Sequence, residues 1–197
     1  MTKKSKLNII LPIAFTVALL VSMIYCGEFA SSGSMFKSVL QLSAIYMLLA
    51  VSLNLLNGFT GLFSLGQAGF MTIGAYTYAI FTIPVKSRAS VYYLYGVADW
   101  LKNIELPVII ALIVAGLAAA LLAAIIGAPV LRLKSDYLAI ATLGFAEVVR
   151  IVVASSPLNK ITNGSLGLKK IPGFESYYGI FIVAFVCIAI IMLLLNS

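Results

Sequence analysis

The sequence has no histidine, only two cysteines and only six acidic residues in 197 positions. Zinc sites and most acid–base or nucleophilic active sites use histidine, so its absence argues strongly against both. Cys26 and Cys187 lie in separate apolar stretches without Cys-x-x-Cys spacing, which does not support a disulfide framework. No Gly-x-x-x-x-Gly-Lys-Ser/Thr phosphate loop occurs. We therefore expect no cofactor, no metal and no enzymatic activity in this chain.

Charge is also scarce. Only 10% of the residues are charged, 62% are hydrophobic and the mean hydropathy is +1.12, a composition that argues against a water-soluble fold. Between Lys37 and Lys86 there is no charged side chain at all, and so long an apolar stretch indicates a membrane protein. The thirteen Lys and Arg residues give a net charge of +7, but they are scattered through the tail and the loops. This pattern predicts membrane topology rather than nucleic-acid binding.

Gaps between charged residues predict six membrane segments, each near the ~20 residues that a hydrocarbon core requires. They are residues 7–26, 39–56, 64–83, 107–131, 137–154 and 178–195. We expect an all-α, polytopic transmembrane helix bundle in which residues 1–197 form a single domain. The third segment is the least regular, because no charge marks a surface turn at its entry. A Gly-rich broken or re-entrant stretch is predicted near residues 57–69.

Positive charges near the segment ends predict the orientation. Lys3, Lys4 and Lys6 precede the first segment, and Arg132 and Lys134 lie in the short link between the fourth and fifth. The positive-inside rule places both groups, and the N-terminus, in the cytoplasm, with the loops at residues 86–105 and 155–177 outside. These loops also carry lysines, but longer loops follow the rule weakly. The first segment exceeds the ~7–15 apolar residues of an export signal, which favours a retained helix over a cleaved one.

Glycines and uncharged polar side chains gather at predicted membrane depth. Such groups face protein or a water-filled path, because polar groups in hydrocarbon are costly unless they are hydrogen-bonded. Two functional interpretations stay open, a substrate pathway and a subunit interface, and a simple helix-packing seam is the structural alternative. The residues are Asn54, Asn57, Gly58, Thr60, Gly61, Ser64, Gly66, Gln67 and Gly69.

Glu147 and Arg150 form the only pair of opposite charges inside a predicted segment, and their spacing places them on one helical face. Glu147 lies about 16 Å along a helix from Asp136, which predicts a position near the middle of the membrane. An intramembrane acid suggests a functional site, whereas the alternative is a pair that only neutralises itself inside the bundle.

Small residues form two adjacent rows along the fourth segment, at i+4 spacing, and predict close packing of this helix inside the bundle. One row comprises Ala115, Ala119, Ala123 and Gly127, and the other comprises Gly116, Ala120, Ala124 and Ala128.

Three stretches taken together resemble the permeases of branched-chain amino-acid ABC importers. The similarity covers roughly residues 53–172, and Asn163 departs from it where a glycine is common. The stretches are Asn54 to Tyr76 with its run Ser64-Leu65-Gly66-Gln67-Ala68, then Leu131 to Arg150 with its run Lys134-Ser135-Asp136-Tyr137, and Thr162 to Leu168.

This resemblance implies a division of labour in a bacterial cytoplasmic (inner) membrane. Two permeases, this chain and a homologous second permease, would form the path for branched-chain or hydrophobic amino acids. Two cytosolic ATPase subunits would drive transport, and an extracytoplasmic substrate-binding protein would deliver the solute. Family members continue past Ser197 with further membrane segments, so we expect a truncated or frameshifted reading frame.

Other classes of function compete with this interpretation. Permeases for urea or short-chain amides have closely similar sequences, so the resemblance does not fix the solute. An ion-coupled secondary transporter would use Glu147 as its ion site and need no partners. A non-transporting scaffold would use the small-residue rows only for assembly.

Overall fold

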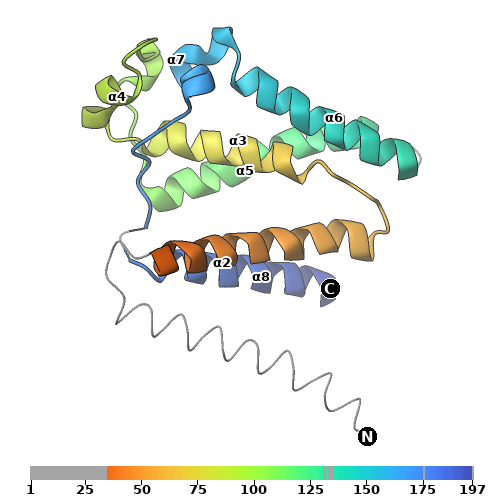
Figure 1. Cartoon of the computed structure of the whole chain (residues 1–197). Coiled ribbons are helices and arrows are strands. Elements are labelled where there is room, and N and C mark those ends of the chain that lie inside the picture. The colour runs from red at the N-terminus through yellow and green to blue at the C-terminus, as the bar shows by residue number, and fades with distance from the viewer. Residues whose placement is uncertain (1–34, 131, 133–134, 175, 197) are drawn as a thin grey trace, which may run out of the picture. The chain divides into compact units, whose positions relative to one another are not determined.

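The computed structural model describes residues 35–130, 132, 135–174 and 176–196, and these residues form helices without any strand (Figure 1). The long helices are α2 (Met35–Asn54), α3 (Gln67–Thr82), α5 (Val108–Val130), α6 (Ser135–Val153) and α8 (Gly179–Asn196). Shorter helices lie between them, α4 (Val85–Val91) and α7 (Asn159–Thr162), with 3-10 turns at Asp99–Leu101, Ser156–Leu158 and Gly164–Leu166. The expected all-α fold is confirmed.

The described helices divide into two compact units. In the first unit, residues of α2 up to Ser52 pack against α8. Ala44 and Ala184 are buried there beside Phe181, and the Lys37 ammonium lies 5.4 Å from the centroid of the Tyr177 ring. Both helices are mainly apolar, and small side chains at the contact allow close approach.

The second unit, residues 53–174, is built around α3, which contacts both α5 and α6. Figure 1 shows α3 beside α5, with α3 and α6 beginning at the same end of this unit. Alanines occupy several of its buried helix positions, which are Ala79 on α3, Ala111 and Ala115 on α5, and Ala146 on α6. Small side chains let helices approach closely where lipid provides no hydrophobic driving force.

Only part of the fourth predicted segment is packed within the chain. Ala115 is buried on α5, and the other members of its row, Ala119, Ala123 and Gly127, are partly buried. The second row, from Gly116 to Ala128, is exposed, and a Cβ added at Gly116 would meet no atom within 4 Å. Among the described residues only the first row is packed, because α3 covers one side of α5. Close packing of the second row inside the bundle stays a prediction.

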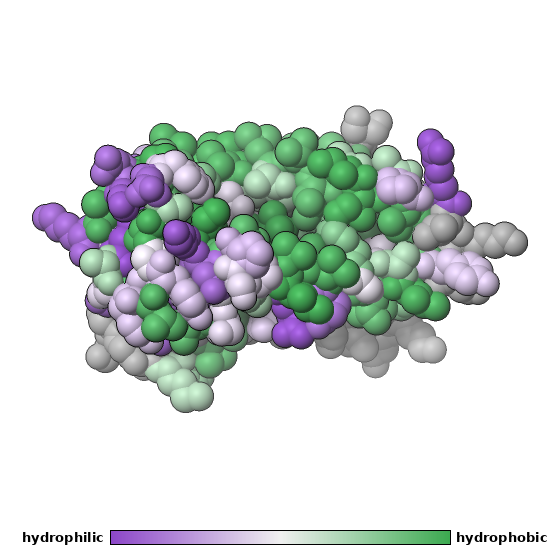
Figure 2. All heavy atoms as spheres, turned by 90° about the horizontal axis from the view of Figure 1, so that it is seen from above, coloured by the Kyte–Doolittle hydropathy of each residue, from purple (hydrophilic) through white to green (hydrophobic). Residues whose placement is uncertain are grey.

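At the end of the second unit where α3 and α6 finish, two loops pack against each other, and we call residues 83–106 and 155–173 the cap. Arg88 is only 3% exposed, and its guanidinium donates to the backbone carbonyl oxygens of Ile83, Leu101 and Ile104. Hydrophilic atoms gather at this end in Figure 2, while hydrophobic atoms cover the middle of the same face. A charged side chain inside the cap is thus paired entirely with backbone.

Long-range hydrogen bonds join the two loops of the cap. The Tyr92 hydroxyl donates to the Ile161 carbonyl oxygen at 2.6 Å, and the Ala98 amide donates to the Lys160 carbonyl oxygen at 3.2 Å. Burial raises the pKa of the Tyr92 hydroxyl to about 12, although the positive charge of Arg88 lowers it. Both predicted external loops therefore lie on the same side of the second unit, as the predicted topology requires.

Asn163 has a backbone φ of 61°, in the left-handed region that glycine and asparagine reach most readily. Its side-chain amide donates to the carbonyl oxygens of Val91 at 3.2 Å and Gly167 at 2.8 Å. Asparagine therefore provides the backbone conformation available to a glycine and adds hydrogen bonds that hold the cap.

The predicted membrane segments match the helices with shifts of a few residues at their ends. By length and composition, Met35–Phe59 and Val108–Val130 are each able to cross a membrane. Two bent pairs also pass if each counts as one span, α3 with α4 at 119° and Tyr137–Val153 with Ser156–Thr162 at 53°, and Gly179–Leu195 is a shorter apolar helix. The first predicted segment, residues 7–26, lies outside the described residues. The single-domain arrangement stays a prediction.

Candidate functional site

An irregular stretch of chain separates the end of α2 from the start of α3. A π-helical turn occupies Leu55–Phe59, and residues 60–66 have no regular helix until Gln67 begins α3. Gly61 lies in this stretch with a φ of +67°, a conformation that side chains rarely adopt. The predicted Gly-rich break is confirmed, and π-helical turns are frequent at functional sites.

Side-chain hydrogen bonds replace the missing helical ones in the break. The Ser64 amide donates to Asn57 Oδ1 at 3.1 Å, and the Gly66 amide donates to Ser64 Oγ at 3.4 Å. The Thr60 hydroxyl donates to the Leu56 carbonyl oxygen. Backbone groups at membrane depth need such partners, because water is scarce there. Three of the predicted polar residues thus hold the break in place.

Thr142 on α6 fixes the break to the rest of the second unit. Its Oγ1 accepts a hydrogen bond from the Leu65 amide at 3.0 Å, while its hydroxyl lies within donor range of the carbonyl oxygens of Leu138 and Ala139. Thr142 is only 8% exposed. One buried hydroxyl therefore links α6 to the end of the break, two residues before α3 begins.

Gly66 and Gly69 occur where α3 meets α6 most closely. A Cβ added at Gly69 would lie 3.0 Å from the Ala146 Cα, and one at Gly66 would lie 3.3 Å from the Thr142 Cβ. Beside them, the rings of Phe70 and Phe145 have centroids 5.8 Å apart. For these two glycines, the packing interpretation explains the absence of a side chain.

The remaining predicted residues lie differently. Asn54, Gly58, Thr60 and Gly61 are exposed, while Asn57 and Gln67 are partly buried. A Cβ at Gly58 would come within 2.5 Å of Asn54 Oδ1, so this glycine leaves room for its neighbour's side chain. The predicted set therefore divides into an inner group held against α6, comprising Ser64, Gly66 and Gly69, and an outer group on the chain surface.

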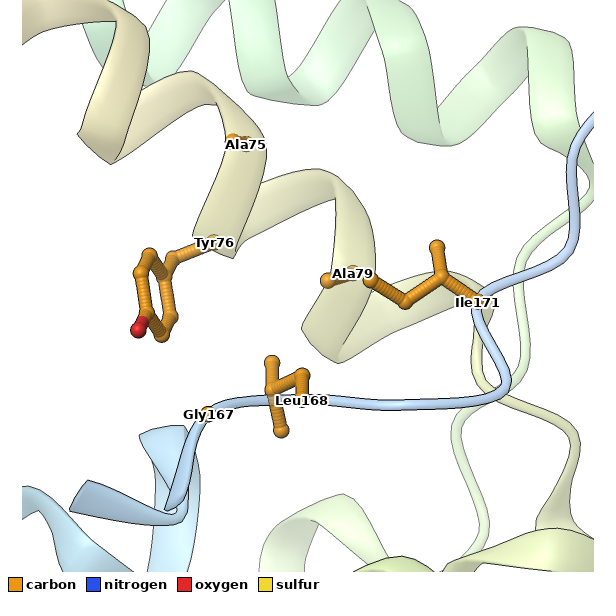
Figure 3. A pocket seen from close by; sticks show the side chains of 6 residues that line it. All are labelled: Ala75, Tyr76, Ala79, Gly167, Leu168 and Ile171. Carbon is orange, nitrogen blue, oxygen red and sulfur yellow. The ribbon is translucent and has the colours of Figure 1, made fainter. Parts of the chain in front are cut away.

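An apolar pocket of about 240 Å³ opens between α3 and the loop that follows Gly167. Figure 3 shows Leu168 and Ile171 of this loop beside Ala79, whereas the Tyr76 ring extends away from Ile171. One wall of the pocket belongs to the cap, and nearby the Tyr78 hydroxyl donates to the Pro172 carbonyl oxygen at 2.7 Å. Its walls have few polar groups, so it suits an aliphatic group.

Glu147 and Arg150 form the predicted pair. Arg150 Nε donates to Glu147 Oε2 at 3.0 Å, and Arg150 Nη2 donates to Glu147 Oε1 at 2.5 Å. Their side chains are exposed, 53% for Glu147 and 71% for Arg150, so within this chain the pair is not inside the helix packing. Along the helix axis, Glu147 lies about 18 Å from the start of α6 and about 9 Å from its end, and its position near the middle of the membrane stays a prediction.

Sequence reasoning missed two residues that position these features. Thr142 lies in the stretch that carries the family resemblance, but its partner is a backbone amide 77 residues away. Arg88 looked like one more scattered surface charge, and its backbone acceptors have no signature in a sequence. Only the absence of a nearby acid at helical spacing around Arg88 offered a signal.

Comparisons with known proteins agree on one family. The family described as "Branched-chain amino acid transport system / permease component" matches residues 35–197. The high-affinity branched-chain amino acid transport system permease protein LivM of Escherichia coli (strain K12) is 39% identical over 158 residues, and that of Salmonella typhimurium (strain LT2) is 37% identical over 158 residues. Each match covers 80% of this chain and 32% of the relative, so the chain spans about a third of their length. No solved structure matches the chain.

Proposed function

The chain belongs to the family of permease components of branched-chain amino acid transport systems, and from this premise we propose that it is a permease subunit of an ATP-driven importer of branched-chain amino acids. The observation that carries the proposal is the break between α2 and α3. Its glycines and polar side chains interrupt an apolar helix, and they are fixed by hydrogen bonds to one another and to Thr142. A break of this kind in a membrane helix is typical of a transport path.

Different members of the break have different roles in this proposal. The outer group, Asn54, Gly58, Thr60 and Gly61, lines the substrate path or the contact with a second permease. The inner group keeps the break rigid against α6, through the close approach at Gly66 and Gly69. Asn57 connects the two groups because its Oδ1 accepts a hydrogen bond from the Ser64 amide.

Transport by such a subunit needs partners. The division of labour proposed here places this chain beside a homologous second permease in a bacterial inner membrane, with its N-terminus in the cytoplasm. Two cytosolic ATPase subunits hydrolyse ATP, since the sequence has no phosphate loop. An extracytoplasmic binding protein delivers the amino acid.

Reconstitution tests the proposal directly. The chain is coexpressed with the candidate second permease, ATPases and binding protein, copurified, and placed in liposomes containing ATP or no nucleotide. In a complete permease that carries this sequence, we expect ATP-dependent accumulation of leucine, isoleucine and valine, with no accumulation of urea. Leu62→Ile is the matched control for Gly66→Leu and Gly69→Leu, because it changes a side-chain shape in the break without obstructing the α3–α6 contact.

Three results would contradict the proposal. ATP-dependent accumulation of urea instead of leucine would make the substrate wrong. Uptake by the chain alone, driven by an ion gradient and abolished by an ionophore, would indicate a secondary transporter. Failure of the chain to copurify with any ATPase or second permease, together with no ion-driven uptake by the chain alone, would leave only a scaffold role.

A further inference from the structure

The Glu147–Arg150 pair lies on a side of α6 that nothing in the described chain covers. Thr142, Ala146, Val149 and Val153 form the buried side of this helix. Ile140, Leu143 and Ile151 are exposed by 71%, 56% and 57%, and the two charged side chains lie among them. A carboxylate and a guanidinium thus occur within an otherwise aliphatic helix surface.

Lipid is a poor neighbour for this surface. Charged side chains in a membrane segment are costly when they face hydrocarbon, and they are found facing protein or water-filled cavities. Mutual pairing lowers this cost without removing it, because each group has further hydrogen-bonding capacity. Glu147 and Arg150 therefore need hydrogen-bonding partners in addition to each other.

The unused donors of Arg150 and the unused acceptor positions of Glu147 show which groups such a partner must carry. Arginine has five N–H donors and the pair uses two of them, which leaves three N–H groups. The carboxylate of Glu147 has about four acceptor positions and also uses two within the pair. A complementary ligand therefore carries an anionic acceptor for Arg150 and a cationic donor for Glu147, close together.

We propose that the Glu147–Arg150 pair is a subsite for the ammonium and carboxylate groups of a zwitterionic α-amino acid. The ammonium group donates to Glu147, the carboxylate accepts from the free N–H groups of Arg150, and an aliphatic side chain lies on Leu143 or Ile151. In an α-amino acid a single carbon joins the two charged groups, which suits a carboxylate and a guanidinium that are in direct hydrogen-bond contact. This inference rests on the proposed function, whose cargo is a zwitterion of this kind.

Direct binding tests the subsite without the other subunits. The full chain is placed in nanodiscs of phosphatidylglycerol and phosphatidylcholine, and radiolabelled L-leucine is displaced by unlabelled competitors. These are leucine, 4-methylpentanoate, which lacks the ammonium group, and 3-methylbutylamine, which lacks the carboxylate. We expect leucine to compete at least about tenfold better than either analogue, because a hydrogen bond to a charged group is lost in each.

Two variants assign the two charges separately. Glu147→Gln should bring leucine and 4-methylpentanoate to equal potency, and Arg150→Gln should do the same for leucine and 3-methylbutylamine. Arg150→Lys keeps the positive charge and should retain part of the preference for leucine over the amine. A purely structural pair would not change the order of the competitors. Asp99→Asn and Lys102→Gln are matched controls, since this pair has the same i,i+3 spacing and lies outside the helix packing.

Other outcomes overturn the inference. Variants that fold and keep the wild-type order of competitors would show that the pair does not read the zwitterion. If phosphatidylethanolamine in the nanodiscs abolishes leucine binding, the pair is occupied by a lipid headgroup instead. If the single variants do not fold, the uncharged double variant Glu147→Gln/Arg150→Gln is used. If it still prefers leucine over both analogues, the proposed subsite is contradicted.

Failure of the subsite and failure of the proposed function remain separable. ATP-dependent leucine accumulation by the reconstituted complex, together with unchanged competitor order in the pair variants, would remove only the subsite. Zwitterion-selective binding by the chain, in a complex that transports urea, would remove only the function.

Discussion

Arg88 is the residue with the most demanding environment in the cap. It is buried, and its guanidinium donates to three backbone carbonyl oxygens without an acid nearby among its hydrogen-bond partners. The planar guanidinium reaches several acceptors at fixed angles, which a lysine ammonium does not reproduce. Arg88 therefore joins α4 to the end of α3, to the turn at Leu101 and to Ile104.

Replacing Arg88 by lysine should loosen the cap. We expect a loss of about 2–3 kcal/mol in the free energy of opening the cap, because buried carbonyl oxygens lose charged donors. Hydrogen exchange at the Leu101 and Ile104 amides measures this opening. Lys102→Arg is the control, since Lys102 is exposed and pairs only with Asp99. Unchanged protection in Arg88→Lys would contradict this account of the residue.

Gly69 tests the close approach of α3 and α6. Gly69→Leu should destabilise the second unit by about 2–4 kcal/mol, because its Cβ alone would lie 3.0 Å from the Ala146 backbone. Thermal unfolding followed by helix content gives the measurement. Gly61→Ala makes a useful comparison, since a Cβ there meets no atom within 4 Å but is strained by a φ of +67°. Equal stability of Gly69→Leu and the wild type would show that the two helices separate freely.

For single residues, the sequence predicted which side chains pair or group together, but not how exposed they are or what they contact. The spacing of Glu147 and Arg150 predicted their ion pair, since i,i+3 positions on a helix are neighbours. Their exposure was not predicted, because it depends on which side of α6 packs against α3. The glycine series was found, but its division at Ser64 depends on contacts with Thr142 and Ala146 far along the chain.

At the scale of helices and loops, the sequence predicted what nearby residues determine and missed what depends on distant contacts. Apolar runs between charges located the long helices to within a few residues, since hydrophobic length is a local property. The short helices α4 and α7 were missed because their loops carry no strong helix periodicity. Their folding into a cap depends on the buried side chains of Arg88, Tyr92 and Asn163.

The cap should respond to alkaline pH through Tyr92. Burial raises the pKa of its hydroxyl to about 12 from the usual 10, so the folded cap binds this proton more tightly than the unfolded loop does. The stabilisation is complete below pH 10 and is lost as the pH rises through about 12. Fluorescence of Trp100, the single tryptophan, should report this opening.

Tyr92→Phe separates this residue from the other tyrosines. The variant lacks the hydrogen bond to Ile161, so its cap should be weaker at neutral pH and should lose the steepest part of the alkaline change. An alkaline transition identical to that of the wild type would assign the effect to another group.

For the whole molecule, the orientation in the membrane stays a prediction that chemistry can test. The cap brings both longer loops to one end of the second unit, whereas α5 ends and α6 begins at the other. In a background with Cys26 and Cys187 replaced by serine, a membrane-impermeant thiol reagent added to intact cells should label Ser87→Cys. It should label Ser135→Cys only after the membrane is opened. Labelling of Ser135→Cys from outside would reverse the topology.

The cap also has a consequence for the order in which the chain is made. Arg88 makes hydrogen bonds to residues no more than 16 positions away. The acceptor of the Tyr78 hydroxyl, the Pro172 carbonyl oxygen, is synthesised 94 positions later. At synthesis rates of about 5–20 residues per second, that interval lasts roughly 5–20 seconds. During this time α3 is already made while the loop that completes its far end does not yet exist. Until the second loop is synthesised and packs against it, the first loop is therefore stabilised only by its own contacts. The hydrogen bonds of Arg88 to backbone carbonyl oxygens are the main ones.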